Sequence, residues 1–330
     1  MINIYTGPSI GKVMVDHAAS PKANVIREDF LESWRAGGLT GTIFQISNWN
    51  TVGMLLGEIR RSEGELVFCR DRAEYENRPE GSFAIMMSCE GYISFAGDWE
   101  ALNLMAELGI TAFTFSHNVQ NLLATGCVDR SGQGGFTSLG KATLDELAQL
   151  PLMVDLVHLS RKSFWDAIEI YDGDVFVSHA NSAAVFDHPR NLTDDQIKAV
   201  AERNGVIGMT SYRGYQREDP YQATLSDWLD HAVHIYDLVG AEHLAIGADF
   251  SGSPMEIVGP SLDAVDPEGL GGLKGGGADI YAVGPAGAED ASRLGNVLAG
   301  LGERGLSQDE LDLVAGGSYL AMWERARPSL

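Results

Sequence analysis

Met153-Val-Asp-Leu-Val-His-Leu159 and Val175-Phe-Val-Ser-His179 are two short, mostly apolar runs separated by a stretch with helical periodicity. Runs that are apolar throughout, rather than alternating, are typical of parallel strands buried on both faces. The same pattern of a strand followed by a helix recurs along the chain. It predicts eight strands: Val13–His17, Gly41–Ser47, Phe83–Glu90, Ala112–His117, Met153–Leu159, Val175–His179, Gly205–Tyr212 and His243–Phe250. Eight strands alternating with helices indicate an α/β fold, a single (β/α)8 barrel of the TIM type.

The ends of the predicted helices carry capping residues. Asp98 is an N-cap candidate for a helix that stops at Gly109. Thr193 opens a capping box with Gln196, and a longer helix covers residues 225–239. These signals support the alternation of strands and helices.

A doubly wound open sheet is the alternative architecture. It is disfavoured because no glycine-rich phosphate-binding fingerprint follows the first predicted strand. The glycines of residues 269–277 have neither Walker nor GxGxxG spacing, so we interpret them as part of a loop after the last strand, at about 251–290. We therefore expect one barrel domain over residues 1–330.

The charge of the chain excludes two classes of partner. Its 330 residues include 46 acidic and 23 basic side chains, which gives a formal net charge of −23. Binding to nucleic acid or to an anionic membrane surface needs clustered Lys and Arg, so we expect neither partner.

Three cysteines form no CxxC pair, and the N-terminus lacks the features of a secretory signal. No apolar run approaches the roughly 18 residues of a membrane span. We expect a cytoplasmic protein.

Six of the eight predicted strands end in a side chain that binds metals or transfers protons: His17, Glu90, His117, His158, His179 and Asp249. In a (β/α)8 barrel the carboxyl ends of the strands converge on one face, where the active site lies. Imidazole and carboxylate together suit Zn²⁺, and a carboxylate can bridge two metal ions. The sequence therefore predicts a zinc site on this face.

The other four histidines are interpreted as ordinary residues. His231 and His234 lie on the predicted helix 225–239, where the spacing of Asp227 and His231 predicts an exposed ion pair. His188 lies in a loop, and His243 begins a strand at the end away from the site. We assign no metal to these four residues.

Several fragments, in this order, resemble a known family. They are Ala36-Gly-Gly-Leu-Thr-Gly-Thr-Ile-Phe-Gln45, Ser88-Cys-Glu-Gly91, Phe115-Ser-His-Asn118 with Asn121, Asp155-Leu-Val-His-Leu-Ser160, Val177-Ser-His-Ala-Asn-Ser182, His188-Pro-Arg-Asn191 with Thr193-Asp-Asp195, Ile246-Gly-Ala-Asp-Phe250, Leu306-Ser-Gln-Asp-Glu-Leu311 and Gly316-Gly-Ser-Tyr-Leu320. Their order and spacing resemble the membrane dipeptidase (renal dipeptidase-like) family of zinc peptidases, also called peptidase family M19. The resemblance implies a (β/α)8 barrel, and the last two fragments look like its closing C-terminal helices.

The resemblance also implies a ligand set for two zinc ions. Glu90 looks like the carboxylate that bridges them, His158 and His179 look like ligands of one ion, and His17 looks like a ligand of the other. The family's first strand ends in His-x-Asp, but here Ala19 stands where the second ligand belongs. We therefore expect one firmly bound zinc ion and a second that is weak or absent.

Three further residues resemble the family's substrate machinery. His117 looks like the histidine that binds the substrate and steadies the tetrahedral intermediate. Arg190 looks like the arginine that holds a substrate carboxylate or the developing oxyanion, a task that suits its planar fork. Asp249 looks like the acid and base that passes a proton from the attacking water to the leaving amine.

These residues favour a metal-dependent hydrolase that cleaves the amide bond of dipeptides or similar small amides. The missing Asp ligand motivates an alternative, a mononuclear amidohydrolase that acts on N-acyl amino acids or lactams. A third hypothesis is a non-catalytic barrel that has lost part of its metal site. The resemblance also makes a homodimer possible.

Overall fold

The computed structural model describes residues 1–6, 24–46, 48–90, 98–129, 134–249 and 283–327. Its strands are β1 (Ile2–Thr6), β2 (Gly41–Ile46), β3 (Leu66–Phe68), β4 (Phe83–Cys89), β5 (Ala112–Thr114), β6 (Met153–Asp155), β7 (Val175–Phe176), β8 (Ile207–Met209) and β9 (Leu244–Ile246). Its α-helices are α2 (Leu31–Ala36), α3 (Trp49–Arg61), α4 (Arg72–Glu76), α5 (Trp99–Leu108), α6 (Ser138–Leu147), α7 (Arg161–Ile170), α8 (Asp194–Glu202), α9 (Leu225–Val239), α12 (Gly295–Glu303), α13 (Gln308–Asp312) and α14 (Ser318–Ala326).

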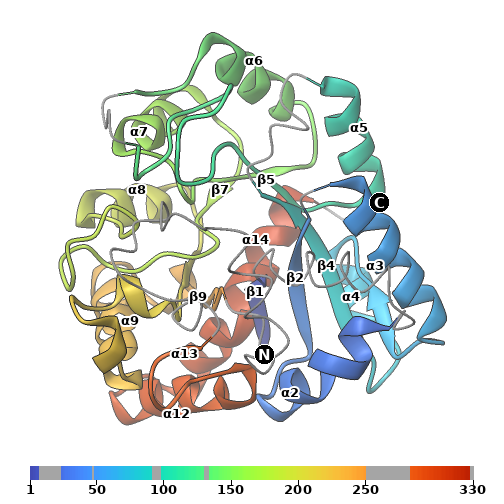
Figure 1. The fold of residues 1–330 in the computed structure, drawn as a ribbon, viewed down its shortest axis with the longest axis vertical. Coiled ribbons are helices and arrows are strands. Elements are labelled where there is room, and N and C mark those ends of the chain that lie inside the picture. Colours follow the sequence, from blue (N-terminus) through green and yellow to red (C-terminus); the bar gives the residue numbers. More distant parts are fainter. Residues whose placement is uncertain (7–23, 47, 91–97, 130–133, 250–282, 328–330) are drawn as a thin grey trace.

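The strands pair in parallel and close into a ring. Hydrogen-bonded neighbours follow the order β7-β6-β5-β4-β2-β1-β9-β8, with β3 added beside the first half of β4. The two ends of this order meet where Val177 pairs in parallel with Ile207. There the Val177 N–H donates to the carbonyl of Val206 at 2.9 Å, and the Gly208 N–H donates to the carbonyl of Val177 at 2.8 Å. Helices surround the ring (Figure 1). The predicted (β/α)8 architecture is therefore confirmed.

The first barrel strand is not the predicted one. β1 (Ile2–Thr6) pairs with both β2 and β9 and so occupies the first strand position of the barrel. Val13–His17, which was predicted to fill that position, lies outside the described residues. Ile2 and Ile4 are buried, and their two-residue spacing is the signal of a strand with one inward face. The prediction missed this run because Ile2-Asn-Ile-Tyr-Thr6 alternates apolar and polar residues, whereas the predicted strands were recognised as continuously apolar runs.

Most of the other predicted strands are too long at their carboxyl ends. β5, β6, β7 and β9 end at Thr114, Asp155, Phe176 and Ile246. His117, His158, His179 and Asp249 each lie three residues beyond one of these ends. The site residues are therefore carried by the loops that leave the strands. The apolar runs continue past the ladders because those loops are themselves buried.

One end of the barrel is closed by the C-terminal helix. Tyr319, Met322 and Trp323 of α14 belong to one buried apolar cluster with residues near the amino ends of the strands, among them Ile2 and Met153. Figure 1 shows α14 crossing near the middle of the ring. α13 and α14, joined by a π-helical turn over Leu313–Gly317, account for the expected closing helices. The amino end of the barrel is thus filled, which leaves the carboxyl end for a site.

The predicted helix ends are confirmed. The Asp98 side chain accepts a hydrogen bond from the Ala101 N–H at the start of α5, and Gly109 ends that helix in a left-handed conformation. Thr193 and Gln196 form the predicted capping box of α8. α9 covers the predicted residues 225–239.

The ion pair expected on α9 is wrong. His231 is fully buried, and its ring contacts the Ser182 N–H through Nδ1 at 3.2 Å and the Gln216 carbonyl through Nε2 at 3.1 Å. Asp227 instead caps its own helix through Thr224 and pairs with Arg217. The helix turns His231 toward the barrel, because apolar neighbours at helical spacing share its face. His231 therefore has a structural role inside the fold, where it joins the backbone at Ser182 to the backbone at Gln216.

Among the described residues, no helix is long and apolar enough to cross a membrane. Most of the glycine-rich loop predicted at 251–290 lies outside the described residues, which resume at 283.

Candidate metal centre

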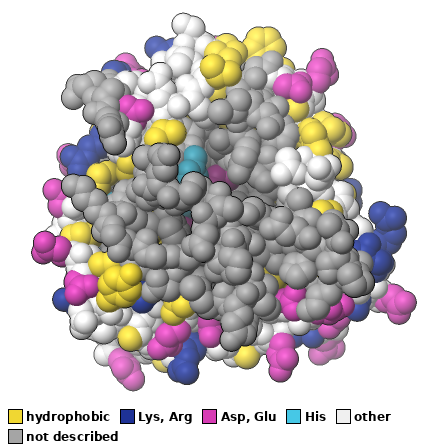
Figure 2. Space-filling model, in the orientation of Figure 1, with side chains coloured by type: hydrophobic (Ala, Val, Ile, Leu, Met, Phe, Trp, Pro, Cys, Tyr) yellow, Lys and Arg dark blue, Asp and Glu magenta, His cyan; other side chains and the backbone are white. Residues whose placement is uncertain are grey.

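Side chains with metal-binding atoms gather where the strands of the barrel end. Glu90 follows β4, His117 follows β5 and His158 follows β6, and their ligand atoms lie within 4.8 Å of one another. His179, which follows β7, joins this group through His158, because the two Nε2 atoms lie 3.1 Å apart. Glu90, His158 and His179 are buried, whereas His117 is exposed. Figure 2 shows a histidine beside an acidic side chain near the middle of this face.

The ligand atoms face one another in a way that fits a cation between them. Asn118 Oδ1 lies 2.9 Å from His158 Nδ1, which places the ring hydrogen on Nδ1 and leaves a lone pair on Nε2. The His158 Nε2 atom lies 3.1 Å from Glu90 Oε1, and Glu90 Oε1 accepts no hydrogen bond from the described residues. Acceptors so close together repel unless a positive charge lies among them. Ligand atoms about 2.0–2.1 Å from a tetrahedral Zn²⁺ are about 3.3–3.4 Å apart, so the spacing fits such an ion.

Both buried histidines favour the neutral form that binds metals. Burial lowers the pKa of His158 and of His179 well below the ordinary value of 6.5, and the positive charge of Arg190 lowers both further. A neutral imidazole keeps a lone pair for a metal, whereas a protonated ring has none.

Arg190 is held in place behind the histidines. Its side chain is buried, and Nη2 donates to the backbone carbonyl of His179 at 3.2 Å. The guanidinium carbon lies 5.1 Å from the ring centre of Tyr215. Its backbone N–H donates to His188 Nδ1 at 3.1 Å. These contacts fix a cation next to the candidate metal centre.

Asp249 lies at the edge of the same group. Its Oδ2 is 3.8 Å from His179 Nε2, and the side chain is partly buried. Burial raises the pKa of its carboxyl well above the ordinary value, Glu90 raises it further, and Arg190 opposes this. A carboxyl whose protonated form is stabilised in this way is suited to take up and release a proton.

His158 and Asp249 share an uncommon backbone conformation. Their φ angles are 63° and 58°, and among the described residues only two other non-glycine residues, Glu63 and Asn204, have a positive φ. Residues in the left-handed region store strain, and such strain gathers at functional sites. The conformation turns the chain sharply just where each side chain enters the site.

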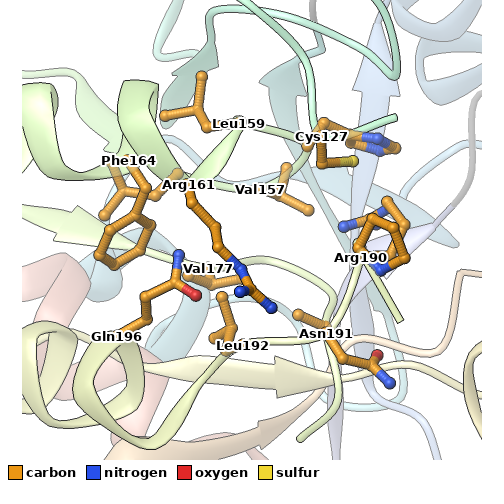
Figure 3. Close-up of a pocket in the computed structure, with 14 residues that line it drawn as sticks. Cys127, Val157, Leu159, Arg161, Phe164, Val177, Arg190, Asn191, Leu192 and Gln196 are labelled. Carbon is orange, nitrogen blue, oxygen red and sulfur yellow. The ribbon is translucent and has the colours of Figure 1, made fainter. Parts of the chain in front are cut away.

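A pocket adjoins His158 and Arg190 (Figure 3). Cys127 and Arg190 lie on one side of it, with Phe164 and Gln196 on the other. Burial raises the pKa of the Cys127 thiol, so the thiol is neutral and unsuited as a nucleophile. Arg190 is buried beside this pocket, and shielding from bulk water strengthens its electrostatic interactions.

With this geometry, comparison with known proteins identifies the family. Residues 55–263 match the family described as membrane dipeptidase (peptidase family M19). The chain belongs to the membrane dipeptidase family. Membership in this family and the cluster of possible metal ligands, Glu90, His117 and His158, together support a metal cofactor.

Individual relatives of the membrane dipeptidase family agree with this assignment. An uncharacterized dipeptidase of Schizosaccharomyces pombe is 30% identical over 241 residues, which cover 72% of this chain and 52% of that protein. The chain spans about half the length of the curated relatives it matches.

Solved structures resemble the fold over nearly its whole length. A metallopeptidase from Rhodobacter sphaeroides has a TM-score of 0.81 at 20% identity and covers 99% of both chains. An amidohydrolase from Pseudomonas aeruginosa has a TM-score of 0.78 at 22% identity and covers 91% of this chain and 92% of its own. At these identities the likeness supports the fold.

The structure does not place every residue expected from the membrane dipeptidase resemblance. It brings together Glu90, His117, His158, His179, Arg190 and Asp249. His17 and Ala19 lie outside the described residues, so the second metal position stays a prediction.

The sequence analysis did not identify the residues that contact the candidate metal ligands and Arg190. Asn118 contacts His158, Tyr215 contacts Arg190, and Ser178 contacts His179 Nδ1 at 2.9 Å. Asp155 lies behind Ser178, and burial raises the pKa of its carboxyl to about 7 against the lowering effect of hydrogen bonds from Ser178. The available signal was a carboxylate inside an otherwise apolar run, at Asp155.

Proposed function

We propose that this chain is a zinc-dependent hydrolase that cleaves the amide bond of dipeptides or similar small amides with a metal-activated water. The observation that carries the proposal is the convergence of acceptor atoms on Glu90, His158 and His179 beside the buried Arg190. Membership in the membrane dipeptidase family supports a peptide bond as the target. The Rhodobacter sphaeroides neighbour, which is liganded with a phosphinate mimic of L-Ala-D-Ala, supports a dipeptide substrate.

Glu90, His158 and His179 would hold the proposed zinc ion. A bound zinc ion polarises the scissile carbonyl and lowers the pKa of water toward about 7. His17 is proposed as a ligand of a second ion, which binds weakly or not at all because Ala19 cannot coordinate. Three protein ligands with one open position are the usual arrangement of a catalytic zinc site.

Asp249 is proposed as the general base and acid. Its carboxylate accepts a proton from the attacking water and returns it to the nitrogen of the leaving amine. The raised pKa of Asp249 makes its protonated form more accessible than that of an ordinary carboxyl group, which suits the return of the proton to the amine. Its distance of 3.8 Å from His179 Nε2 supports a position beside the reacting water.

Arg190 and His117 are proposed to bind the substrate. Arg190 holds a substrate carboxylate or the oxyanion, because its guanidinium is fixed by His179 and Tyr215 and is shielded from bulk water. His117 is exposed beside the ligands, with its ring centre 4.2 Å from that of His158. It can reach a bound substrate and steady the tetrahedral intermediate.

A second candidate is a mononuclear amidohydrolase acting on N-acyl amino acids or lactams. Ala19 favours it, since only one complete ligand set is expected. Turnover of an N-acyl amino acid or a lactam, without turnover of any dipeptide, would decide for this candidate.

We further propose that residues 1–330 form one barrel domain, because β1 near the N-terminus pairs with β9 late in the chain. Three free cysteines support a cytoplasmic location. The family resemblance supports a homodimer.

The experiment that tests the proposal is an assay of the purified chain against a panel of dipeptides with added Zn²⁺. We expect hydrolysis by the wild type and a loss of about 10²–10⁴-fold in kcat for Asp249→Asn. Asp237→Asn, at an exposed position on α9, is the matched control and should retain activity. Absence of hydrolysis with zinc bound, or full activity in Asp249→Asn, refutes the proposal.

A further inference from the structure

We propose that His188 is a positioning residue that holds Arg190 in place for the binding of an anionic group of the substrate. It does so by accepting a hydrogen bond from the Arg190 backbone and by packing against Tyr215, over whose ring the guanidinium lies. The inference deepens the proposed function and rests on the task given there to Arg190. The proposed chemistry itself gives His188 no task.

His188 opens a tight turn that leads to Arg190. The Asn191 N–H donates to the His188 carbonyl at 2.9 Å, which closes a β-turn over residues 188–191 with Pro189 at its second position. The Arg190 N–H donates to His188 Nδ1 at 3.1 Å. In such turns an Asp or Asn side chain commonly accepts from the N–H two residues further on, and proline is favoured at the second position. His188 makes the same contact with a ring nitrogen.

The backbone fixes the direction of this hydrogen bond. A backbone N–H only donates, so His188 Nδ1 accepts and the hydrogen of the neutral ring is on Nε2. Partial burial and the positive charge of Arg190 lower the pKa of His188 to about 4, against the opposite effect of Asp187, so the ring is neutral at neutral pH. The turn therefore needs an acceptor at this position, which a carbon ring of similar size cannot provide.

The His188 ring also contacts two other aromatic rings. Its centre lies 6.1 Å from the ring centre of Phe186 and 4.8 Å from that of Tyr215. Asn191 Nδ2 donates to the backbone carbonyls of Phe186 and Tyr215, each at 2.8 Å, and so joins the two segments that carry these rings. The Arg190 guanidinium carbon lies 5.1 Å from the ring centre of Tyr215. The backbone bond thus fixes where the Arg190 side chain begins, and the rings limit where its guanidinium can lie.

A fixed arginine suits the recognition of a negatively charged group. An arginine side chain has many rotamers, and holding it in one of them before the substrate arrives lowers the entropy cost of binding. A preorganised charge also stabilises a developing oxyanion without rearrangement. The Arg190 Nη2 atom donates to the His179 carbonyl at 3.2 Å, so the side chain is held beside a candidate metal ligand. His188 therefore contributes to substrate affinity through Arg190.

The test measures the affinity of the zinc-loaded protein for a phosphinate mimic of L-Ala-D-Ala by calorimetry, and kcat/KM for the best dipeptide. His188→Phe keeps an aromatic ring but removes the acceptor. We expect both quantities to fall by about 10–100-fold, with zinc content unchanged. His188→Asn loses the ring but keeps an acceptor for the Arg190 N–H, so it should retain most of the affinity. A role in packing alone would give the opposite order of the two variants.

His243→Phe is the matched control. His243 is also partly buried, and its Nδ1 contacts the Gly205 carbonyl at 2.8 Å, away from the site. This variant should keep the affinity of the wild type. If His188→Phe does not fold, His188→Ala takes its place, because it lacks the ring as His188→Asn does, and the difference between the two isolates the acceptor.

A double-mutant cycle shows whether His188 acts through Arg190. In a chain that already carries Arg190→Met, the change His188→Phe should cause little further loss of affinity. Losses that multiply in the double variant, or equal affinity of His188→Phe and the wild type, overturn the inference. A wild type that binds the phosphinate but cleaves no dipeptide refutes the proposed function and leaves this inference standing, because its readout is affinity. A wild type that binds no phosphinate overturns both.

Discussion

At the scale of single residues, the direction in which each side chain points matters to the site as much as its chemistry. His158 and Asp249 both have positive φ angles, 63° and 58°, just past the ends of β6 and β9. A left-handed residue reverses the local direction of the chain, and His and Asp accept this conformation better than branched residues do. The strain, of order 1–3 kcal/mol for each residue, is offset by the buried structure around it. At both positions, this conformation places a polar side chain at the candidate metal centre.

Arg190 gives a prediction at this scale. Arg190→Lys keeps the charge but loses the planar fork that reaches the His179 carbonyl and stacks near Tyr215. We expect kcat/KM for the best dipeptide to fall by about 10²–10³-fold, with zinc content unchanged. Arg217→Lys, at an exposed position, should have no effect. Equal activity of Arg190→Lys and the wild type would remove Arg190 from the proposed chemistry.

At the scale of elements, the loop after β5 carries two residues that lie beside the candidate metal ligands. The backbone of this loop packs closely against itself. His117 and Asn118 lie on this loop, and the Cys127 N–H of its returning arm donates to the carbonyl of His158 at 2.7 Å. A Cβ on Gly126 would collide with the backbone of both His117 and Asn118. The loop can therefore fold back on itself only with glycine at this position.

Gly126→Ala should displace this loop. We expect a loss of about 1–3 kcal/mol in the free energy of unfolding, together with weaker zinc binding as Asn118 moves away from His158. Thermal unfolding and chelator competition measure the two effects. Gly53→Ala, on the exposed side of α3 with no atom near the added Cβ, is the control and should not destabilise the chain. Normal zinc binding in Gly126→Ala would show that the loop does not orient His158.

The same elements show what the sequence could predict. Parallel strands all end at one face of a barrel, so polar residues at the ends of apolar runs are expected to meet there. Such residues are recognised from the local sequence alone. In the structure, Glu90, His158 and His179 do converge. Helix caps were predicted because they involve residues only three positions apart, as at Thr193 and Gln196. These features are local, and local chemistry decides them.

Supporting contacts could not be predicted in this way. Asn118 and His158 are 40 residues apart, and Asp155 and Ser178 are 23 apart, so only the closed barrel brings each pair together. The burial of His231 depends on what α9 packs against, which its own sequence does not specify. The first strand was misplaced because pairing with β2 and β9, rather than apolar length, decides which run completes the ring.

At the scale of the whole molecule, the barrel separates stability from chemistry. α14 fills the amino end with Tyr319, Met322 and Trp323, while the carboxyl end holds the polar cluster. The net charge of −23 gives no general attraction for an anionic substrate. Recognition of a substrate carboxylate, as proposed above, would therefore be local, and the buried Arg190 beside the candidate metal ligands is the cation proposed to provide it.

Metal content tests the central claim most directly. Elemental analysis of protein purified without chelator, then dialysed, should give about one zinc ion per chain for the wild type and close to none for His158→Ala. His243→Ala is the control and should keep its zinc, because the His243 ring contacts the Gly205 carbonyl at 2.8 Å, away from the site. A wild-type chain without zinc, or a His158→Ala chain that retains it, would contradict the account.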